Sequence, residues 1–232
     1  MTELLQTGLT ALGLDPAAAP ALAAYGAALI EKNQVMNLTA ITDPTEVAQK
    51  HMLDCAALLG CAPFSGKRVI DVGTGAGFPG LVLKLCQPDI DLTLFDSLQK
   101  RIDWLSELTE ALGTQAACVH GRAEDFGRLD GWREGFDIAT ARAVADLRVL
   151  SELCLPFVKV GGVFLAMKAE DCQPEVDGAS RAITLLGGRL LPPCRYTVPG
   201  TDLRRTVIRV EKIAPTPEKY PRRYAKIRKA PL

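Results

Sequence analysis

Four glycines lie within eight positions of the sequence, at 73, 75, 77 and 80, directly after the strand-like run Val69–Val72. Glycine has no Cβ, so it accepts positive φ angles and lets other groups approach the backbone closely. The apolar run Leu81–Leu85 that follows is typical of a helix start. A strand, a glycine-rich turn and a helix N-terminus together favour a nucleotide-sized binding site over a tight turn without a ligand.

Asp96 is the second residue that could do chemistry at this site. It ends the β-forming run Asp91–Asp96, about 20 residues beyond the glycines, where a carboxylate can accept hydrogen bonds from both hydroxyls of a ribose. The spacing of Gly75, Gly77 and Gly80 fits the dinucleotide pattern, and that of Gly73, Gly75 and Gly77 fits a looser methyltransferase pattern. A nicotinamide-dependent oxidoreductase and an S-adenosylmethionine-dependent methyltransferase both remain open on these residues alone.

The surrounding elements favour the methyltransferase. Five predicted strands alternate with helices, which indicates a parallel sheet with right-handed crossovers. Two further strands are separated by Pro199-Gly200, so we expect an antiparallel hairpin at the end of the chain. The strands are predicted at 68–72, 91–96, 116–120, 136–140, 163–168, 189–198 and 206–213, and the helices at 78–87, 98–112, 149–158 and 174–186.

Five parallel strands and a terminal hairpin make an α/β, Rossmann-like sheet of seven strands, the class I S-adenosylmethionine-dependent methyltransferase fold. A dinucleotide-binding fold would continue with a second parallel half. We therefore divide the chain into an N-terminal helical extension (1–62), a methyltransferase domain (63–213) and a basic C-terminal tail (214–232).

Within the extension, Asp43 is expected to cap a helix that has Pro44 at its first position. His51 and Asp54 lie three residues apart on that helix and so share a face. We interpret His51 as a structural residue.

Composition restricts the class of protein. The chain has 232 residues, of which 48% are hydrophobic and 23% charged, and no apolar run approaches the ~18 residues of a membrane span. The seven cysteines are scattered, with no CxxC pair, which argues against a zinc site and against a disulfide framework. We expect a cytoplasmic monomer without metal, in which nearly all the cysteines are buried thiols and Cys194 is structural.

The net charge of zero hides an uneven distribution. Residues 201–232 contain ten Lys or Arg and three Asp or Glu, a balance of +7, so residues 1–200 carry −7. A basic tail on an acidic body slightly favours a polyanionic partner, such as a nucleic acid, over the alternative of a solvated terminal segment. The proline-rich stretch 215–224 is expected to be an irregular strap on the surface.

Several motifs together resemble the glucose-inhibited division protein B family, the guanine-N7 methyltransferases of bacterial small-subunit ribosomal RNA. The resemblance spans nearly the whole chain, and the Gly-Phe-Pro-Gly turn and the Arg-Ala-Val run are its most specific parts. The motifs that carry it are Asn37–Ile41, Lys50–Asp54, Asp71–Gly80, Asp96–Arg101, Gly121–Asp125, Thr140–Val144, Ala166–Lys168 and Thr216–Arg222.

The resemblance implies S-adenosylmethionine as cofactor and N7 of one guanosine in the 530 loop of 16S rRNA as the methyl acceptor, with the rRNA or a small-subunit precursor as partner. Gly73 and Phe78 would line the methionine end of the cofactor, Asp96 would hold the ribose, and Ala123 and Glu124 would flank the adenine. The implied cofactor-binding residues are Gly73, Gly75, Gly77, Phe78, Asp96, Ala123, Glu124 and Arg142, and the implied catalytic residues are Arg142, Lys168 and Arg205.

Chemistry agrees with this assignment. Guanine N7 carries an in-plane lone pair and no proton, so the transfer needs no general base, and Arg142 is better understood as an orienting donor to guanine O6 or to a phosphate. Thr140–Ala143 stands where adenine-N6 enzymes carry an Asn/Asp-Pro-Pro motif. A non-catalytic RNA-binding assembly factor with a vestigial pocket remains an alternative, but it would not need the glycines or Asp96.

Overall fold

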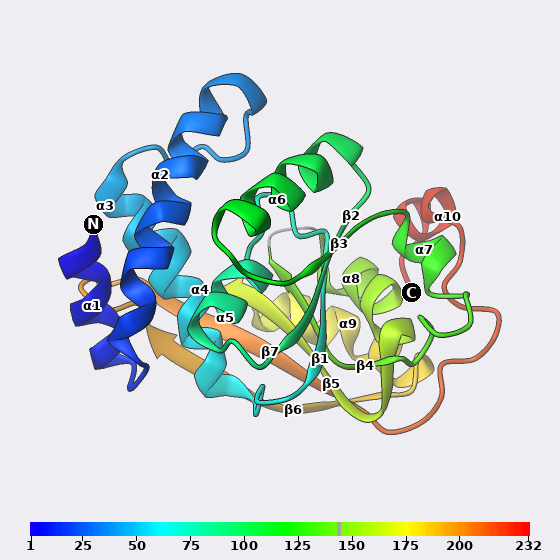
Figure 1. The fold of residues 1–232 in the computed structure, drawn as a ribbon. Coiled ribbons are helices and arrows are strands. Elements are labelled where there is room, and N and C mark those ends of the chain that lie inside the picture. The colour runs from blue at the N-terminus through cyan, green and yellow to red at the C-terminus, as the bar shows by residue number, and fades with distance from the viewer. Residues whose placement is uncertain (143–144) are drawn as a thin grey trace.

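The computed structural model describes residues 1–142 and 145–232, in which a seven-stranded sheet runs through the centre (Figure 1). The strand order is β3-β2-β1-β4-β5-β7-β6. The first five strands are parallel, and β7 inserts between β5 and β6 antiparallel to both. The strands are β1 (Arg68–Val72), β2 (Asp91–Asp96), β3 (Ala117–His120), β4 (Phe136–Arg142), β5 (Val158–Ala169), β6 (Gly188–Thr197) and β7 (Arg204–Lys212).

This arrangement confirms the predicted methyltransferase sheet, and the strand ends differ from the predicted ones by two residues at most, except at the start of β5. Strand β4 continues to Arg142, two residues further than predicted, and so carries that side chain itself. Strand β5 begins at Val158 and not at 163, after an irregularity in its pairing with β4. Because β5 and β7 are antiparallel, Ala169 pairs with Arg205, which brings the start of β7 to the carboxyl end of the parallel strands.

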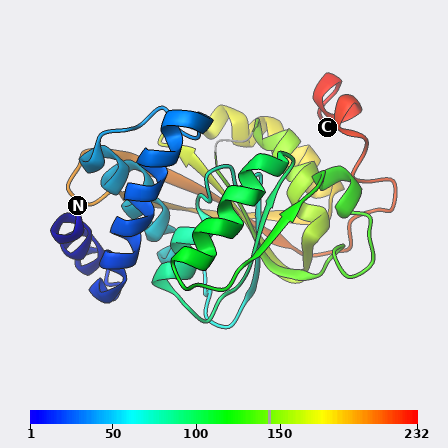
Figure 2. The ribbon, with the colours of Figure 1, turned by 45° about the horizontal axis from the view of Figure 1, so that its top comes forward.

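Helices cover both faces of the sheet (Figure 2). One buried cluster joins α2, α5 and α6 to one face, and a second joins α8, α9 and α10 to the other. The helices are α1 (Thr2–Ala11), α2 (Ala19–Met36), α3 (Pro44–Val47), α4 (Asp54–Ala56), α5 (Gly80–Cys86), α6 (Gln99–Ala111), α7 (Ala123–Phe126), α8 (Leu147–Cys154), α9 (Gln173–Leu185) and α10 (Tyr224–Lys229). Among the described residues, no helix has the length and apolar character that crossing a membrane requires.

The helix predicted after Asp43 forms, but it is not regular. Asp43 caps it as expected, since its carboxylate accepts hydrogen bonds from the backbone N–H groups of Thr45 and Glu46. Beyond α3, residues Ala48–Leu53 form a π-helical segment that leads into α4. Such widened turns occur often at functional sites because they redirect side chains. Here both His51 and Asp54 are buried.

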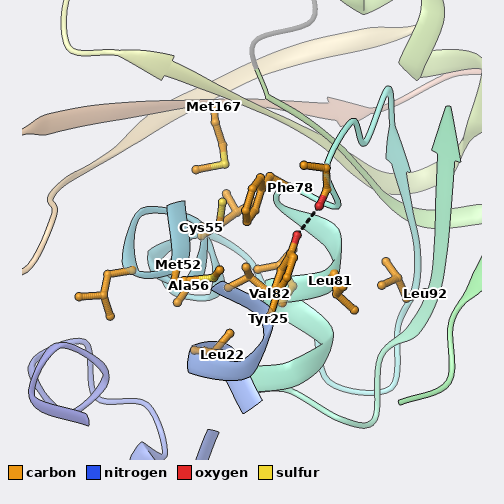
Figure 3. Close-up of a cluster of buried hydrophobic side chains, with 14 of the residues drawn as sticks. Leu22, Tyr25, Met52, Cys55, Ala56, Phe78, Leu81, Val82, Leu92 and Met167 are labelled. Carbon is orange, nitrogen blue, oxygen red and sulfur yellow. Dashed lines mark hydrogen bonds between the residues drawn. The ribbon is translucent and has the colours of Figure 1, made fainter. Parts of the chain in front are cut away.

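The N-terminal helices share a core with the glycine-rich turn (Figure 3). Tyr25, from α2, donates a hydrogen bond of 2.5 Å from its hydroxyl to the carbonyl of Ala76, and its ring stacks on Phe78 with centroids 5.3 Å apart. Met52 and Cys55 complete the cluster from the side of α4. The extension thus supports the turn directly, and the division at residue 62 remains a proposal.

The tail is irregular over residues 215–223, as predicted, but it is docked on the globular body and does not lie free in solvent. It ends in α10, and its Tyr220 and Ile227 side chains are buried in the second cluster. Arg128 and Arg133 donate hydrogen bonds to tail carbonyls, including those of Pro221 and Tyr220. Proline-rich, basic composition suggested solvent exposure, but two arginines of the globular body satisfy the tail's backbone acceptors and dock it.

The expectation that nearly all seven cysteines are buried thiols outside any disulfide framework is wrong for one pair. Cys61 and Cys194 form a disulfide, with Cα atoms 5.7 Å apart, between residues separated by 133 positions. Their contact depends on β6 lying beside the end of the N-terminal helices, which neither cysteine's local sequence indicates. Cys55, Cys154 and Cys172 are free and buried, as expected.

Candidate active site

The glycine-rich turn follows β1 and is held from below by Asp71. Gly73, Gly75 and Gly77 have φ angles of 70°, 59° and 99°, a region that other residues rarely adopt. The fully buried Asp71 carboxylate accepts hydrogen bonds from Thr74 Oγ1 (2.6 Å), Gly80 N (2.9 Å) and Thr140 Oγ1 (2.9 Å).

Asp71 therefore ties the turn to the start of α5 and to β4. Burial raises its pKa to about 6, and its three donors act in the opposite direction. No role was predicted for Asp71 from the sequence, although an acidic residue inside an apolar strand is a signal that points to such a role.

A cavity of about 340 Å³ opens above this turn. Gly73, Gly75 and Phe78 line it from the turn, Asp96 from the end of β2, and Arg142 from the end of β4. Gly77, the remaining predicted glycine, packs behind the turn, where an added Cβ would lie only 2.6 Å from the Tyr25 hydroxyl. Gly77 shapes the turn and is not among the residues that line this cavity.

A smaller cavity of about 150 Å³ continues from the first one. The two share Gly73 and Asp96, and the smaller one is lined further on by Ala123, Glu124 and Tyr224. Ala123 and Glu124 were predicted here; Tyr224, from the tail, was not.

Asp96 is almost fully buried between these two cavities, with 3% of its surface exposed. Its Oδ2 accepts a hydrogen bond from Gly75 N (2.9 Å) and faces Arg101 Nη1 at 3.3 Å, and its Oδ1 accepts from Leu98 N (2.9 Å). These contacts hold the Asp96 carboxylate in one orientation, and they tie it to the glycine-rich turn. Its remaining lone pairs are therefore fixed in direction as well.

A further cavity, of about 420 Å³, shares lining residues with the cavity above the glycine turn. Arg142, Lys168 and Arg205, the three predicted catalytic residues, all line it. His51 and Arg142 line both this cavity and the one above the glycine turn, so they stand where the two meet. We name it the acceptor cavity. Lys168 Nζ is held at its edge by Glu175 Oε1 at 2.6 Å.

Arg142 is oriented by four neighbours. Its guanidinium carbon lies 4.6 Å from the centre of the Phe78 ring, within the range of a cation–π contact. Its Nη2 donates to His51 Nδ1 (3.1 Å), and its Nη1 lies 3.3 Å from Lys50 O and 3.8 Å from Asp54 Oδ2. The side chain is thereby fixed across the junction of the two cavities.

His51 lines both cavities, a position that its interpretation as a structural residue did not include. Its ring stacks on Phe78 with centroids 4.7 Å apart, and Nε2 lies 2.8 Å from Thr39 Oγ1. Burial, and then the charge of Arg142, lower the pKa of His51 to about 4. The ring is therefore neutral at pH 7, accepting at Nδ1 and donating from Nε2.

Asp54, for which the sequence predicted a position but no role, also lines the acceptor cavity. Its carboxylate is buried, accepts a hydrogen bond from the Tyr196 hydroxyl at 2.9 Å, and lies 3.3 Å from Arg205 Nε. With Arg142 on its other side, it links two of the three predicted catalytic residues. Their i, i+3 spacing put His51 and Asp54 on one face, but only the folded chain shows that this face lines the acceptor cavity.

Across residues 1–142 and 145–232, no three His, Cys, Asp or Glu side chains gather in a way that could hold a metal ion.

Comparison with known proteins identifies the family. A sequence model of the family described as rRNA small subunit methyltransferase G matches residues 18–193. The chain belongs to this family. Ribosomal RNA small subunit methyltransferase G of Symbiobacterium thermophilum is 48% identical, with 99% of this chain and 97% of that protein covered. The protein of the same name in Alkaliphilus metalliredigens is 43% identical, with 99% and 98% covered.

Solved structures agree on the fold. A mutant of MtNAS in complex with S-adenosylmethionine aligns with a TM-score of 0.57 at 15% identity, over 81% of this chain and 73% of that one. TrmN from Thermus thermophilus aligns with a TM-score of 0.52 at 21% identity, over 68% and 48%. The predicted S-adenosylmethionine-dependent rRNA methyltransferase is confirmed by the family and the fold, and the nicotinamide-dependent alternative is set aside.

Proposed function

We propose that the protein transfers the methyl group of S-adenosylmethionine to N7 of a guanosine in the 530 loop of 16S rRNA. The observation that supports this most is the junction at which His51 and Arg142 line both the cavity above the glycine turn and the acceptor cavity. A methyl donor in the cavity above the glycine turn and a guanine in the acceptor cavity would meet at this junction. Aligning the two reactants is the main task of such an enzyme.

The residues of the first two cavities fit the cofactor. Asp96 would accept hydrogen bonds from the ribose hydroxyls, Ala123 and Glu124 would flank the adenine, and Gly73 and Phe78 would line the methionine end. Gly75 and Gly77 would keep the turn open enough for the nucleoside. The cofactor, when bound, supplies an activated methyl group on its sulfonium, so the protein itself must bind, orient and exclude water.

The acceptor cavity suits guanine. Arg142 would donate to O6 of the base, whose edge matches the planar fork of a guanidinium, and would leave N7 free. Lys168 and Arg205 would contact the base or its phosphates. Neutral His51 and the paired Asp54 are not aimed at removing a proton, in agreement with an acceptor nitrogen that has none to lose.

The partner would be 16S rRNA, alone or within a precursor of the small subunit, bound in the cytoplasm by a monomer. The tail residues from 214 onward and the rim of the acceptor cavity would supply cationic contacts. Binding should then weaken steeply with salt, because each phosphate contact releases condensed counterions.

Methylation in vitro tests the proposal. Purified protein and labelled S-adenosylmethionine are incubated with 16S rRNA and with small subunits, both from cells that lack the gene, and nucleosides are analysed by mass spectrometry. We expect 7-methylguanosine as the product, and turnover reduced on the order of 10²-fold in Arg142→Gln but not in Arg148→Gln, a change at an exposed arginine. A different methylated nucleoside would overturn the N7 assignment, and RNA binding without any methylation would favour an assembly factor.

A further inference from the structure

The C-terminal segment 216–229 stands against the smaller cavity, the one lined by Ala123 and Glu124. Tyr224, the first residue of α10, is among the residues that line it. The stretch matched by the family model ends at residue 193, so this side chain lies outside it. In Figure 1, α10 and α7, which carries Ala123 and Glu124, both lie at the end of the molecule opposite to the N-terminal helices.

A buried ion pair fixes the segment at this place. Glu152, on α8, is fully buried, and its carboxylate receives Arg222 Nη2 at 2.6 Å and the backbone N–H of Arg222 at 2.8 Å. The next residue along α8, Leu153, lines the same cavity as Tyr224. One partner of the ion pair, Arg222, therefore lies two residues before Tyr224 in the chain. The other, Glu152, lies next to a residue of α8 that lines the cavity.

Further contacts leave the segment little freedom to move away. Arg128 Nε donates to Pro221 O at 2.9 Å, and Arg133 Nη1 donates to Tyr220 O at 3.0 Å. On the other side of Tyr224, Ile227 is completely buried. Tyr224 itself is only half-buried: it packs against the second cluster between these fixed points, and it lines the cavity.

We propose that the segment 216–229 is a wall of the adenine end of the cofactor site and that the ring of Tyr224 contacts the adenosine part of the bound cofactor. This rests on the cofactor site proposed above. The segment would then serve the cofactor as well as the RNA, and Tyr224 would be a binding residue that the glycine motif and Asp96 do not reveal. An aromatic ring against a purine is a contact of considerable strength, which substitution by alanine removes.

Calorimetric titration tests the contact with two ligands. S-adenosylhomocysteine fills both ends of the site, whereas 5′-methylthioadenosine has the adenosine but no amino-acid end. Because the lost contact is to the adenosine, Tyr224→Ala should weaken both ligands by the same factor, about tenfold. Arg228→Ala, an exposed change on the same helix, should leave both within twofold of the wild type.

The result that overturns the inference is wild-type affinity of Tyr224→Ala for S-adenosylhomocysteine. Wild-type protein that binds neither ligand would instead overturn the cofactor site itself, and with it this inference. Hydrogen exchange of the wild type gives a second test that does not depend on a variant folding. Amides of 222–229 should exchange more slowly when S-adenosylhomocysteine saturates the site, and unchanged exchange in the liganded protein would refute a wall that touches the ligand.

Discussion

Replacing Asp96 by asparagine tests the grip on the cofactor with minimal change of shape. The structure shows why alanine would be a poorer choice: Asp96 also accepts hydrogen bonds from Gly75 N and Leu98 N, so deleting its carboxylate would release the turn as well. Asparagine keeps one oxygen, but its NH₂ group must face either one of these N–H donors or the ribose.

The expected magnitude follows from the bonds that are lost. A hydrogen bond to a charged group contributes about 1.5–3 kcal/mol, and the variant loses one such bond to the ribose and weakens the other. A loss of about 2–3 kcal/mol corresponds to a dissociation constant raised roughly 30- to 150-fold. The ion pair with Arg101, at 3.3 Å, is lost too, which should lower the stability of the unliganded protein slightly.

Titration calorimetry with S-adenosylhomocysteine measures this effect, and circular dichroism checks that the variant is folded. Asp103→Asn, an exposed change on α6, is the matched control and should bind as the wild type does. An Asp96→Asn variant that is folded and binds within about threefold of the wild type would refute the ribose assignment.

Three further predictions concern the acceptor cavity and the tail. Asp54→Asn should lower turnover about tenfold or more, because Arg142 loses its orienting carboxylate, while the affinity for S-adenosylhomocysteine stays within twofold; an unchanged turnover would contradict this. Burial lowers the pKa of His51 to about 4 in the folded protein. As the pH falls below 6.5, the unfolded chain therefore takes up a proton at His51 before the folded one does. The contribution of neutral His51 to the free energy of unfolding is complete above pH 6.5 and is lost as the pH falls. The advantage of the wild type over His51→Gln in unfolding free energy should therefore shrink by about 2 kcal/mol between pH 7 and pH 5 in denaturant titrations, and a constant difference would refute it. Arg222→Met leaves the Glu152 charge buried without its partner, so calorimetry should show destabilisation of about 3–5 kcal/mol and a midpoint lower by roughly 6–20 °C, and a shift below 1 °C would exclude the ion pair as an anchor.

The local sequence was sufficient to predict the sheet and the site residues at the carboxyl ends of its parallel strands. Each parallel strand ends at the same edge, so an acid at the end of one strand and Arg142 at the end of another had to come close once the strand–helix alternation was recognised. Arg205 reached that edge for a different reason, because β7 runs antiparallel to β5 and pairs Arg205 with Ala169. The resemblance to the family identified Arg205 as a candidate, and the register of β5 with β7 explains why it lies at this edge.

Apart from Asp71, whose position inside an apolar strand was a local signal, the missed features depend on contacts between distant parts of the chain. His51 became a site residue through stacking on Phe78 and contact with Arg142, neither of which its helical spacing indicates. The disulfide joins residues 133 positions apart, and the tail docks through arginines that precede it by about 90 positions. Pattern and propensity describe near neighbours, so tertiary contacts of this kind had no local signal.

The most direct test of the central claim is a map of methylated guanosines in 16S rRNA from cells with and without the gene. Nuclease fragments analysed by mass spectrometry would give both the position and the methylated atom. We predict that a single 7-methylguanosine in the 530 loop disappears when the gene is removed and returns with the wild-type gene but not with Arg142→Gln. An identical map in both strains, or loss of a methyl group at another position, would contradict the account.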